Sequence, residues 1–419
     1  MPRRPAISRA RSGLLLYLAT AFFARLAEEG MAVAVVLLAL QHSGSAGQGA
    51  FVLTAWMAPH VIAAPLVGAL VSRMRRPRLC YLGALGGFAA AIAVLALSVG
   101  RAPAPVTLAV ALAGGSFGPV VSGGLSSLLT GLLPAGGPRD RAYALDAAVY
   151  NAASVVGPAV AGLTAAVASP GAAMLLLAGA AATAAALVAG LPYGRAHPAP
   201  AGRAPATTLR AELAAGLMAV WRIRALRALT AGTCLAFVGV GGLTTTTVLL
   251  AGHRGDPGAG GILMTAFALG ALAGSLAVAG WQPPLSDPRL ATLALCGTGL
   301  ALAAAALTVS PAAATALFVL AGLCDGPLLT ATLRIRAAHA PPPVRAQVFT
   351  LGAGLKITAA ACGATLIGVA AALPPPLLLL GIAAVHLAAA LLYTLVRPRT
   401  GPSGTPHPPA LLPDTRSLP

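Results

Sequence analysis

Long apolar runs alternate with short polar segments along the whole chain. A helix needs roughly 20 apolar residues to cross the hydrocarbon core of a bilayer, and twelve runs of this chain reach that length. The pattern therefore predicts an all-α polytopic membrane protein. We expect its twelve transmembrane helices at residues 13–40, 49–72, 79–99, 104–132, 144–167, 171–190, 228–250, 258–280, 290–309, 312–335, 346–372 and 375–396.

The second half of the chain repeats the first half in outline. The segment LAGGSFGPVVSGGL at 112–125 returns as LAGLCDGPLLTATL at 320–333, an offset of 208 positions (320 − 112). A second set of matches is offset by 206 and pairs Arg139 with Arg345, Tyr143 with Phe349 and Gly157 with Gly363. Repetition of half of a mostly apolar chain is typical of transporters built from two parallel halves. We therefore expect two six-helix pseudo-repeats.

Each copy of the repeated segment contains a Gly-Pro pair, Gly118-Pro119 in the first and Gly326-Pro327 in the second. Proline has no N–H to donate to the preceding turn, so it bends or interrupts a helix. These pairs predict helix kinks in the fourth and tenth spans.

The longest break between apolar runs divides the chain in two. It covers 191–227, and it begins as a Pro/Ala/Gly linker and ends in an Arg-dotted amphipathic stretch. Such a basic helix is suited to lie on an anionic membrane surface. We expect an N-terminal six-helix bundle at 1–190, a cytoplasmic linker at 191–227, a C-terminal six-helix bundle at 228–396 and a disordered cytoplasmic tail at 397–419.

Composition agrees with a membrane protein, because only 9% of the residues are charged and the mean hydropathy is +0.86. The net charge of +18 does not indicate a nucleic-acid partner, since the arginines lie in short loops rather than along one face. No Walker, HExxH or G-x-S-x-G sequence occurs in a suitable context, and the five cysteines form no C-x-x-C pair. We expect no enzyme, no bound metal and no cofactor.

The distribution of arginine predicts the orientation in the membrane. With the N-terminus inside, 23 arginines fall in cytoplasmic segments and only Arg101 and Arg254 fall outside. Cytoplasmic loops carry the excess of basic residues, so both termini are expected in the cytoplasm. The Ala-, Gly- and Arg-rich composition is typical of a GC-rich bacterial genome, which predicts a multi-pass protein of the bacterial plasma membrane.

Five charged residues lie at membrane depth: Arg25, Glu28 and Glu29 in the first span, Asp325 in the tenth and Lys356 in the eleventh. Charges at this depth are costly and usually functional. Both glutamates are within helical reach of Arg25. We hypothesise that one of the three carboxylates binds and releases a proton, while the two cations pair with the others. The alternative is a structural ion network. His60 and His386 are expected to be buried polar groups.

The loop after the second span, GALVSRMRRPRL, resembles the signature of the major facilitator superfamily, roughly G-x-L-a-D-R-x-G-R-R/K. Gly68, Arg73 and Arg76 match, but Ser72 replaces the acidic residue. The resemblance implies that this loop is part of the gate between conformations.

The missing acidic charge leaves two candidates for the latch that the resemblance implies. Asp140 or Asp146 would supply the charge in place of Ser72. The alternative interpretation is that the arginines of the loop only obey the positive-inside rule.

The fifth span carries NAASVVGPAVAGL, which resembles the superfamily's antiporter motif G-x-x-x-G-P-x-x-G-G at Gly157, Pro158 and Gly162. In drug-exporting members this motif marks proton-linked efflux. A purely structural explanation is that these residues bend the helix and allow close packing at the interface between the halves.

The resemblance as a whole implies the major facilitator fold, in which the first, fourth, seventh and tenth spans line a central cavity. We expect a secondary transporter that exports a small organic compound in exchange for protons, by alternating access. The alternatives are an uptake permease or facilitator for a metabolite, and a non-transporting membrane sensor or scaffold. The expected partners are the small-molecule substrate, protons and the lipid bilayer, with the proton gradient as energy source. The chain is expected to act as a monomer.

Overall fold

The computed structural model describes residues 4–44, 46–73, 77–191, 209–254 and 259–398. Within these ranges the regular structure is entirely helical, which confirms the predicted fold class. The tail from 399 and the linker residues 192–208, like Arg76 in the loop after α3, lie outside the described residues.

The first six predicted spans form one bundle. Its helices are α1 (Arg4–Ser43), α2 (Ala46–Met57), α3 (His60–Arg73), α4 (Pro77–Ser98), α5 (Ala104–Gly115), η1 (Val120–Gly124), α6 (Leu125–Ser127), α7 (Leu129–Leu132), α8 (Gly137–Val167) and α9 (Pro170–Ala189).

The last six predicted spans form the second bundle, which follows the linker helix α10 (Leu209–Arg222). Its helices are α11 (Arg224–His253), α12 (Ala259–Trp281), α13 (Asp287–Leu307), α14 (Pro311–His339), the short η2 (Pro342–Val344), α15 (Arg345–Val369) and α16 (Pro375–Val396).

The number of spans agrees with the prediction. Among the described residues, ten helical segments are long and apolar enough to cross a bilayer, and the bent pair formed by α2 and α3, with an angle of 42°, makes an eleventh. The remaining predicted span is α1, which is 40 residues long and carries Arg25, Glu28 and Glu29 in its middle. Large apolar side chains such as Leu97, Leu163 and Leu300 are exposed, as expected of helices that face lipid.

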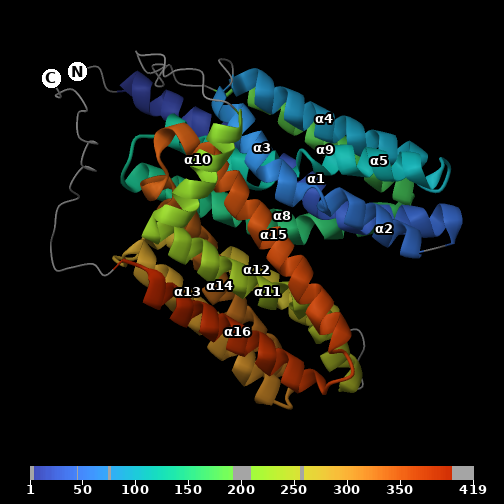
Figure 1. The fold of residues 1–419 in the computed structure, drawn as a ribbon. Coiled ribbons are helices and arrows are strands. Elements are labelled where there is room, and N and C mark those ends of the chain that lie inside the picture. Colours follow the sequence, from blue (N-terminus) through green and yellow to red (C-terminus); the bar gives the residue numbers. More distant parts are fainter. Residues whose placement is uncertain (1–3, 45, 74–76, 192–208, 255–258, 399–419) are drawn as a thin grey trace, which may run out of the picture.

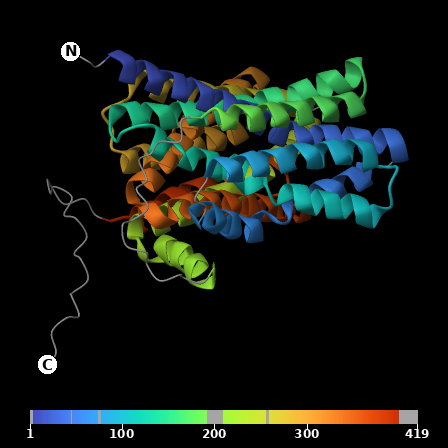
Figure 2. The same ribbon diagram turned by 90° about the horizontal axis from the view of Figure 1, so that it is seen from above.

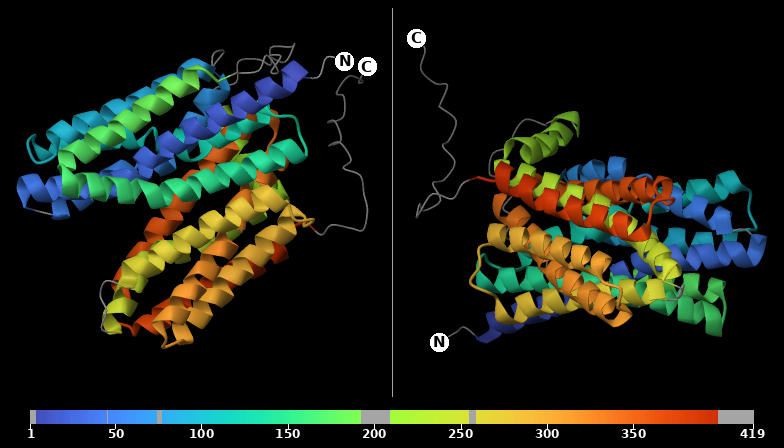
Figure 3. Two further views of the ribbon diagram at one scale, coloured as in Figure 1. Left: turned by 180° about the vertical axis from the view of Figure 1, so that it is seen from behind. Right: turned by 90° about the horizontal axis from the view of Figure 1, so that it is seen from below.

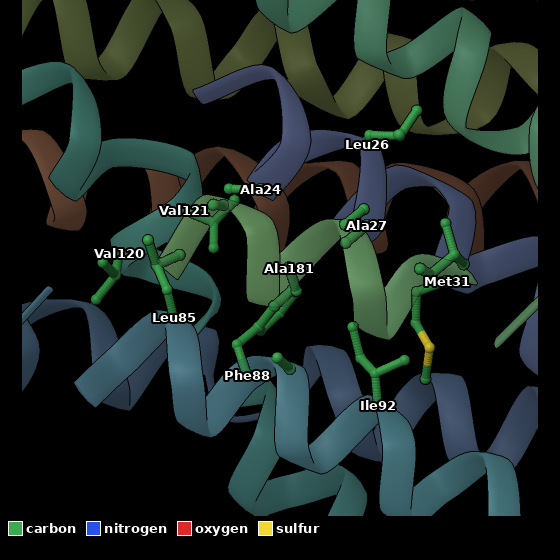
Figure 4. Close-up of a cluster of buried hydrophobic side chains, with 14 of the residues drawn as sticks. Ala24, Leu26, Ala27, Met31, Leu85, Phe88, Ile92, Val120, Val121 and Ala181 are labelled. Carbon is green, nitrogen blue, oxygen red and sulfur yellow. The ribbon is translucent and has the colours of Figure 1, made fainter. Parts of the chain in front are cut away.

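Buried apolar side chains pack the helices of the N-terminal bundle against one another. α1 lies against α8 and α9, and α4 lies against α9. Figure 4 shows the side chains that fill the space between α1, α4, α9 and η1, among them Met31, Phe88, Ile92 and Ala181, all of which are fully buried. α1 is thereby fixed in the middle of its bundle, and its charged residues are held in place with it.

The two bundles meet at the end of the molecule where α1 begins and α16 ends, and they diverge toward the opposite end (Figures 1 and 3). We call the first of these the terminal end. The most extensive contacts between the halves are those of α3 with α15 and of α8 with α12, and α8 also contacts α14. The repeat relates these two pairs, because it makes α8 equivalent to α15. α10 lies on the outside of the bundles near the terminal end (Figure 2).

The two Gly-Pro pairs behave differently. Gly118-Pro119 precedes the π-helical turn η1, so the fourth span is interrupted where a break was expected. A π-type turn inside a span commonly marks a functional position. Gly326-Pro327, in contrast, lies within the continuous helix α14.

Candidate functional site

A cavity lies between the two bundles. It encloses about 480 Å³ of empty space, including its opening. The N-terminal bundle contributes polar side chains from α1, η1, α6 and α8, and the C-terminal bundle contributes side chains from α11, α14 and α15. Its polar and aromatic lining includes Arg25, Asp146, Tyr150, Phe237, Arg336 and Lys356. Of the five charged residues predicted from the sequence, only Arg25 and Lys356 line this cavity.

Arg25 is held by a buried network centred on Asp146. Its Nη1 donates to the Asp146 carboxylate at 2.8 Å and to the Asp146 carbonyl at 2.9 Å, and its Nη2 donates to the Ser126 hydroxyl at 3.0 Å. Tyr17 donates to the same carboxylate at 2.8 Å, and Ser126 donates to its other oxygen at 2.6 Å. Every acceptor oxygen of Asp146 therefore has a partner, and three segments of the N-terminal bundle are tied together.

This network corrects two predictions. Arg25 was expected to pair with Glu28 or Glu29, but its ion pair in the described structure is to Asp146. Asp146 was a candidate for the missing charge of the gate, but it is fully buried beside the cavity and forms an ion pair with Arg25. Spacing along one helix could not reveal this pair, because its partners lie 121 residues apart.

The two glutamates of α1 are partly buried and lie beside different neighbours. Glu28 lies 3.7 Å from Nε2 of His60 on α3, and its Oε2 is buried without a hydrogen-bond partner in the described structure. His60, expected to be only a buried polar group, is therefore a neighbour of an acidic residue. Glu29 lies beside the phenol of Tyr150, which lines the cavity.

Glycines allow the close approach of helices around these acids. Gly157 of α8 packs directly against Glu29 and Gly30 of α1, where a Cβ would meet the α1 backbone. The antiporter-like motif therefore packs α8 onto α1 within one bundle, whereas its residues were expected at the interface between the halves. Gly162 faces open space, and Pro158 is partly exposed within the continuous α8.

Asp325 and Lys356 are partly buried in the C-terminal bundle. Nζ of Lys356 lies 4.4 Å from the centroid of the Phe237 ring, a cation–π contact. In the part of the chain that the structure describes, neither Asp325 nor Lys356 has an ion-pair partner within 4.0 Å. Lys356 and Asp325 do interact electrostatically, so the predicted pairing of Lys356 with a membrane carboxylate is present as a longer-range interaction and not as a direct contact.

Arg336 is a cavity residue that sequence reasoning missed. It was counted among cytoplasmic loop arginines, but α14 continues to His339 and buries Arg336 to 3% exposure. Gly352 of α15 makes room for it, since any Cβ there would collide with the guanidinium. Its Nη2 has no hydrogen-bond partner in the described structure.

The halves are joined at the terminal end by close backbone contact. A Cβ on Gly68 of α3 would collide with Gln347 of α15, and Thr350 of α15 donates to the Ala64 carbonyl at 2.7 Å. Gln347 also donates to the Leu213 carbonyl of α10 at 3.2 Å. Gly68, predicted as a gate residue, therefore lies in the contact between the halves. Ser72 and Arg73 end α3, but their side chains lie outside the described residues.

A second contact between the halves joins α14 to α8 and involves a charged side chain. Arg334 of α14 donates to the Asp140 carbonyl of α8 at 2.7 and 3.0 Å, and its Nη1 lies 3.5 Å from the Asp287 carboxylate at the start of α13. Asp140, a candidate for the latch, thus takes part in this contact through its backbone carbonyl. The carboxylate that faces Arg334 belongs to Asp287, which was not predicted from the sequence.

Two helical bundles that enclose a polar cavity and contact each other at one end define a membrane transporter of the two-domain type. The chain belongs to the Major Facilitator Superfamily, whose sequence profile matches residues 17–281. Like its relatives, it is a multi-pass membrane transporter.

Two relatives match most of the chain. An uncharacterised MFS-type transporter, y4rN, of Sinorhizobium fredii (strain NBRC 101917 / NGR234) is 28% identical over 364 residues, which cover 85% of this chain and 88% of that protein. The multidrug efflux pump Tap of Mycolicibacterium fortuitum is 29% identical over 398 residues, which cover 90% of this chain and 96% of the pump.

Solved structures share the fold at low sequence identity. The human organic anion transporter MFSD10 (TETRAN) superposes with a TM-score of 0.70 at 18% identity, and the E. coli fucose:proton symporter FucP with a TM-score of 0.71 at 11% identity. Each match covers 92% of this chain and 98% of the other. These structures support the twelve-helix major facilitator fold.

Proposed function

We propose that this protein exports a small organic compound in exchange for protons, by alternating access. One observation carries the proposal: Glu28, Glu29 and Asp325 lie at membrane depth without an arginine or lysine at ion-pair distance in the described structure. An ionised carboxylate is costly to bury without a cation, whereas a protonated one is not. A carboxylate in this setting is therefore suited to take up a proton on one side of the membrane and release it on the other.

The contacts at the terminal end support alternating access. In this conformation α3 and α15 touch through Gly68 and Thr350, and Arg334 links α14 to α8. Rocking of the halves about the central cavity would break these contacts and form others at the opposite end. With the terminal end in the cytoplasm, as the positive-inside rule favours, the present conformation would face outward.

Two observations favour export over uptake. The fifth span carries the antiporter-like Gly157-Pro158 pair, which packs next to Glu29. The relative Tap is named a multidrug efflux pump. The energy source would then be the inward proton gradient, with no further cofactor.

Proton-loaded proteoliposomes with a pH-sensitive dye inside test this function. A panel of organic compounds is added to the protein in the absence of any other gradient. The proposal expects some compounds to trigger proton counterflow, and collapse of the pH gradient to stop their concentrative movement. Compounds that move without a proton signal, and at the same rate after the pH gradient is collapsed, would instead make the protein a facilitator.

A further inference from the structure

The charged groups of the central cavity do not balance. Arg25, Arg336 and Lys356 line it together with a single carboxylate, that of Asp146. Asp146 is already occupied, because its oxygens accept from Arg25, Tyr17 and Ser126. The charge of Arg25 is therefore neutralised within the N-terminal bundle. On the opposite wall, Arg336 and Lys356 have no carboxylate at ion-pair distance among the described residues, although Asp325 lies near enough to interact electrostatically with Lys356.

Arg336 is placed as a binding group rather than as a surface charge. Only 3% of the residue is exposed, and its Nη2 is buried without a hydrogen-bond partner in the described structure. Leaving a buried charged donor unpaired is costly. Gly352 keeps the space that the guanidinium occupies, so the packing of α15 on α14 holds this side chain at the cavity.

Lys356 provides a second cation on the next helix. Its Nζ lies over the Phe237 ring, and it lines the same cavity as Arg336, with which it interacts electrostatically. A guanidinium binds carboxylates and phosphates with two parallel hydrogen bonds, and an ammonium adds a point charge. A guanidinium and an ammonium in the same cavity therefore favour the binding of an anionic group.

The C-terminal wall of the cavity also carries apolar side chains. Phe237, Leu329, Leu333, Phe349 and Ile357 line it. Such a wall suits an apolar or aromatic body next to the charged group.

We propose that the transported compound is an organic anion, with one carboxylate, sulfonate or phosphate group bound by Arg336 and Lys356 and an apolar body against the Phe, Leu and Ile side chains of the same C-terminal wall. This inference rests on the proposed transport function, since it names the substrate class of the same cavity. Arg336 and Lys356 are thereby substrate-binding residues.

Equilibrium binding to the purified full-length protein tests the inference without any pH gradient. The probes are naphthoate and other aromatic acids, each matched with its neutral amide and with the amine of the same ring system. Binding is followed by calorimetry and by the rise in melting temperature that a ligand produces. The acids are expected to bind and stabilise the protein, and the amides and amines are not.

Variants then locate the anionic group. Arg336→Gln and Lys356→Gln are each expected to weaken binding of the acids about tenfold or more, a loss of about 1.4 kcal/mol, while Lys356→Arg keeps most of it. Arg222→Gln is the matched control, because Arg222 lies exposed on α10 away from the cavity. Melting temperature without ligand and elution volume show whether each variant is folded.

Three results would overturn the inference. They are failure of every acid in the panel to bind the wild type, equal binding of the amides or amines, and unchanged affinity in folded Arg336→Gln and Lys356→Gln. Proton counterflow that persists with neutral compounds would overturn the anion specificity alone. Binding of acids without any proton counterflow would instead contradict the proposed antiport and leave the anion site in place.

Discussion

Tyr143 of α8 and Phe349 of α15 stack on each other, with ring centroids 6.2 Å apart and an interplanar angle of 25°. The two residues occupy equivalent positions of the internal repeat, 206 residues apart (349 − 143). A residue that contacts its own equivalent must lie close to the axis that relates the two halves. This stack therefore marks the centre of the contact between the bundles, and the contacts that hold the terminal end closed lie around it.

Adding a methyl group at Gly68 should open the terminal end. In Gly68→Ala the new Cβ would collide with Gln347 of α15, and overpacking of this kind costs about 1–3 kcal/mol. Because the collision occurs only when α3 touches α15, the closed population should fall about tenfold or more. Spin labels at the exposed positions Leu79 and Arg289 should then report a longer distance. Gly83→Ala is the control, since nothing lies within 4 Å of a Cβ there; equal distances in both variants would refute this role.

The Arg334 contact should act as a latch. Arg334→Gln removes the charged donor to the Asp140 carbonyl and the ion pair with Asp287. Hydrogen bonds from charged groups contribute about 1.5–3 kcal/mol, so the same labelled pair should shift toward the open distance. Asp287→Asn, which keeps the bond to the carbonyl, should shift it less. A latch role is excluded when Arg334→Gln leaves the distance distribution of the wild type unchanged.

Asp146 should stabilise the fold through Arg25. Asp146→Leu leaves the buried Arg25 without its carboxylate, and breaking a buried ion pair costs about 3–5 kcal/mol. The melting temperature in detergent should fall markedly, and combining Asp146→Leu with Arg25→Met should recover much of the loss. Asp325→Asn is the matched control, because Asp325 has no ion pair within the described residues. A similar melting temperature for Asp146→Leu and Asp325→Asn would contradict this account.

Exchange of an inward proton for an outward organic anion moves two positive charges into the cell per cycle. Each elementary charge is worth about 2.3 kcal/mol per 100 mV, so a membrane potential that is negative inside should strongly accelerate transport. A potassium diffusion potential set with valinomycin in proteoliposomes measures this directly. Transport of the acids at a rate independent of the potential would contradict either the anionic substrate or the one-proton exchange.

Much of the fold could be predicted because its causes are local or periodic. The apolar runs determine the spans, and the offset of 206 between Tyr143 and Phe349 identified the two halves that the structure brings together. The family resemblance implied a central cavity that holds all five membrane charges, Arg25, Glu28, Glu29, Asp325 and Lys356, but of these only Arg25 and Lys356 line it.

The contacts of the site residues could not be predicted in the same way, because they depend on the packing of helices that are distant in the sequence. Arg25 meets Asp146 across 121 residues, although Glu28 and Glu29 are nearer in sequence. Arg336 was counted as a loop residue because the predicted tenth span ended at 335, whereas α14 continues to His339. The space that Gly352 leaves for the Arg336 side chain depends on the packing of α15 on α14, so it is visible only in the structure.

The most direct test of the account is the proton flux carried by the membrane carboxylates. Glu28→Gln, Glu29→Gln and Asp325→Asn are reconstituted beside the wild type, with Arg222→Gln as a control at an exposed position of α10. Proton movement and compound movement are recorded together in the same vesicles. At least one of the three variants is expected to lose proton flux while still exchanging labelled compound across the membrane, and Arg222→Gln is expected to keep both. Proton flux equal to that of the wild type in all three variants would contradict the account.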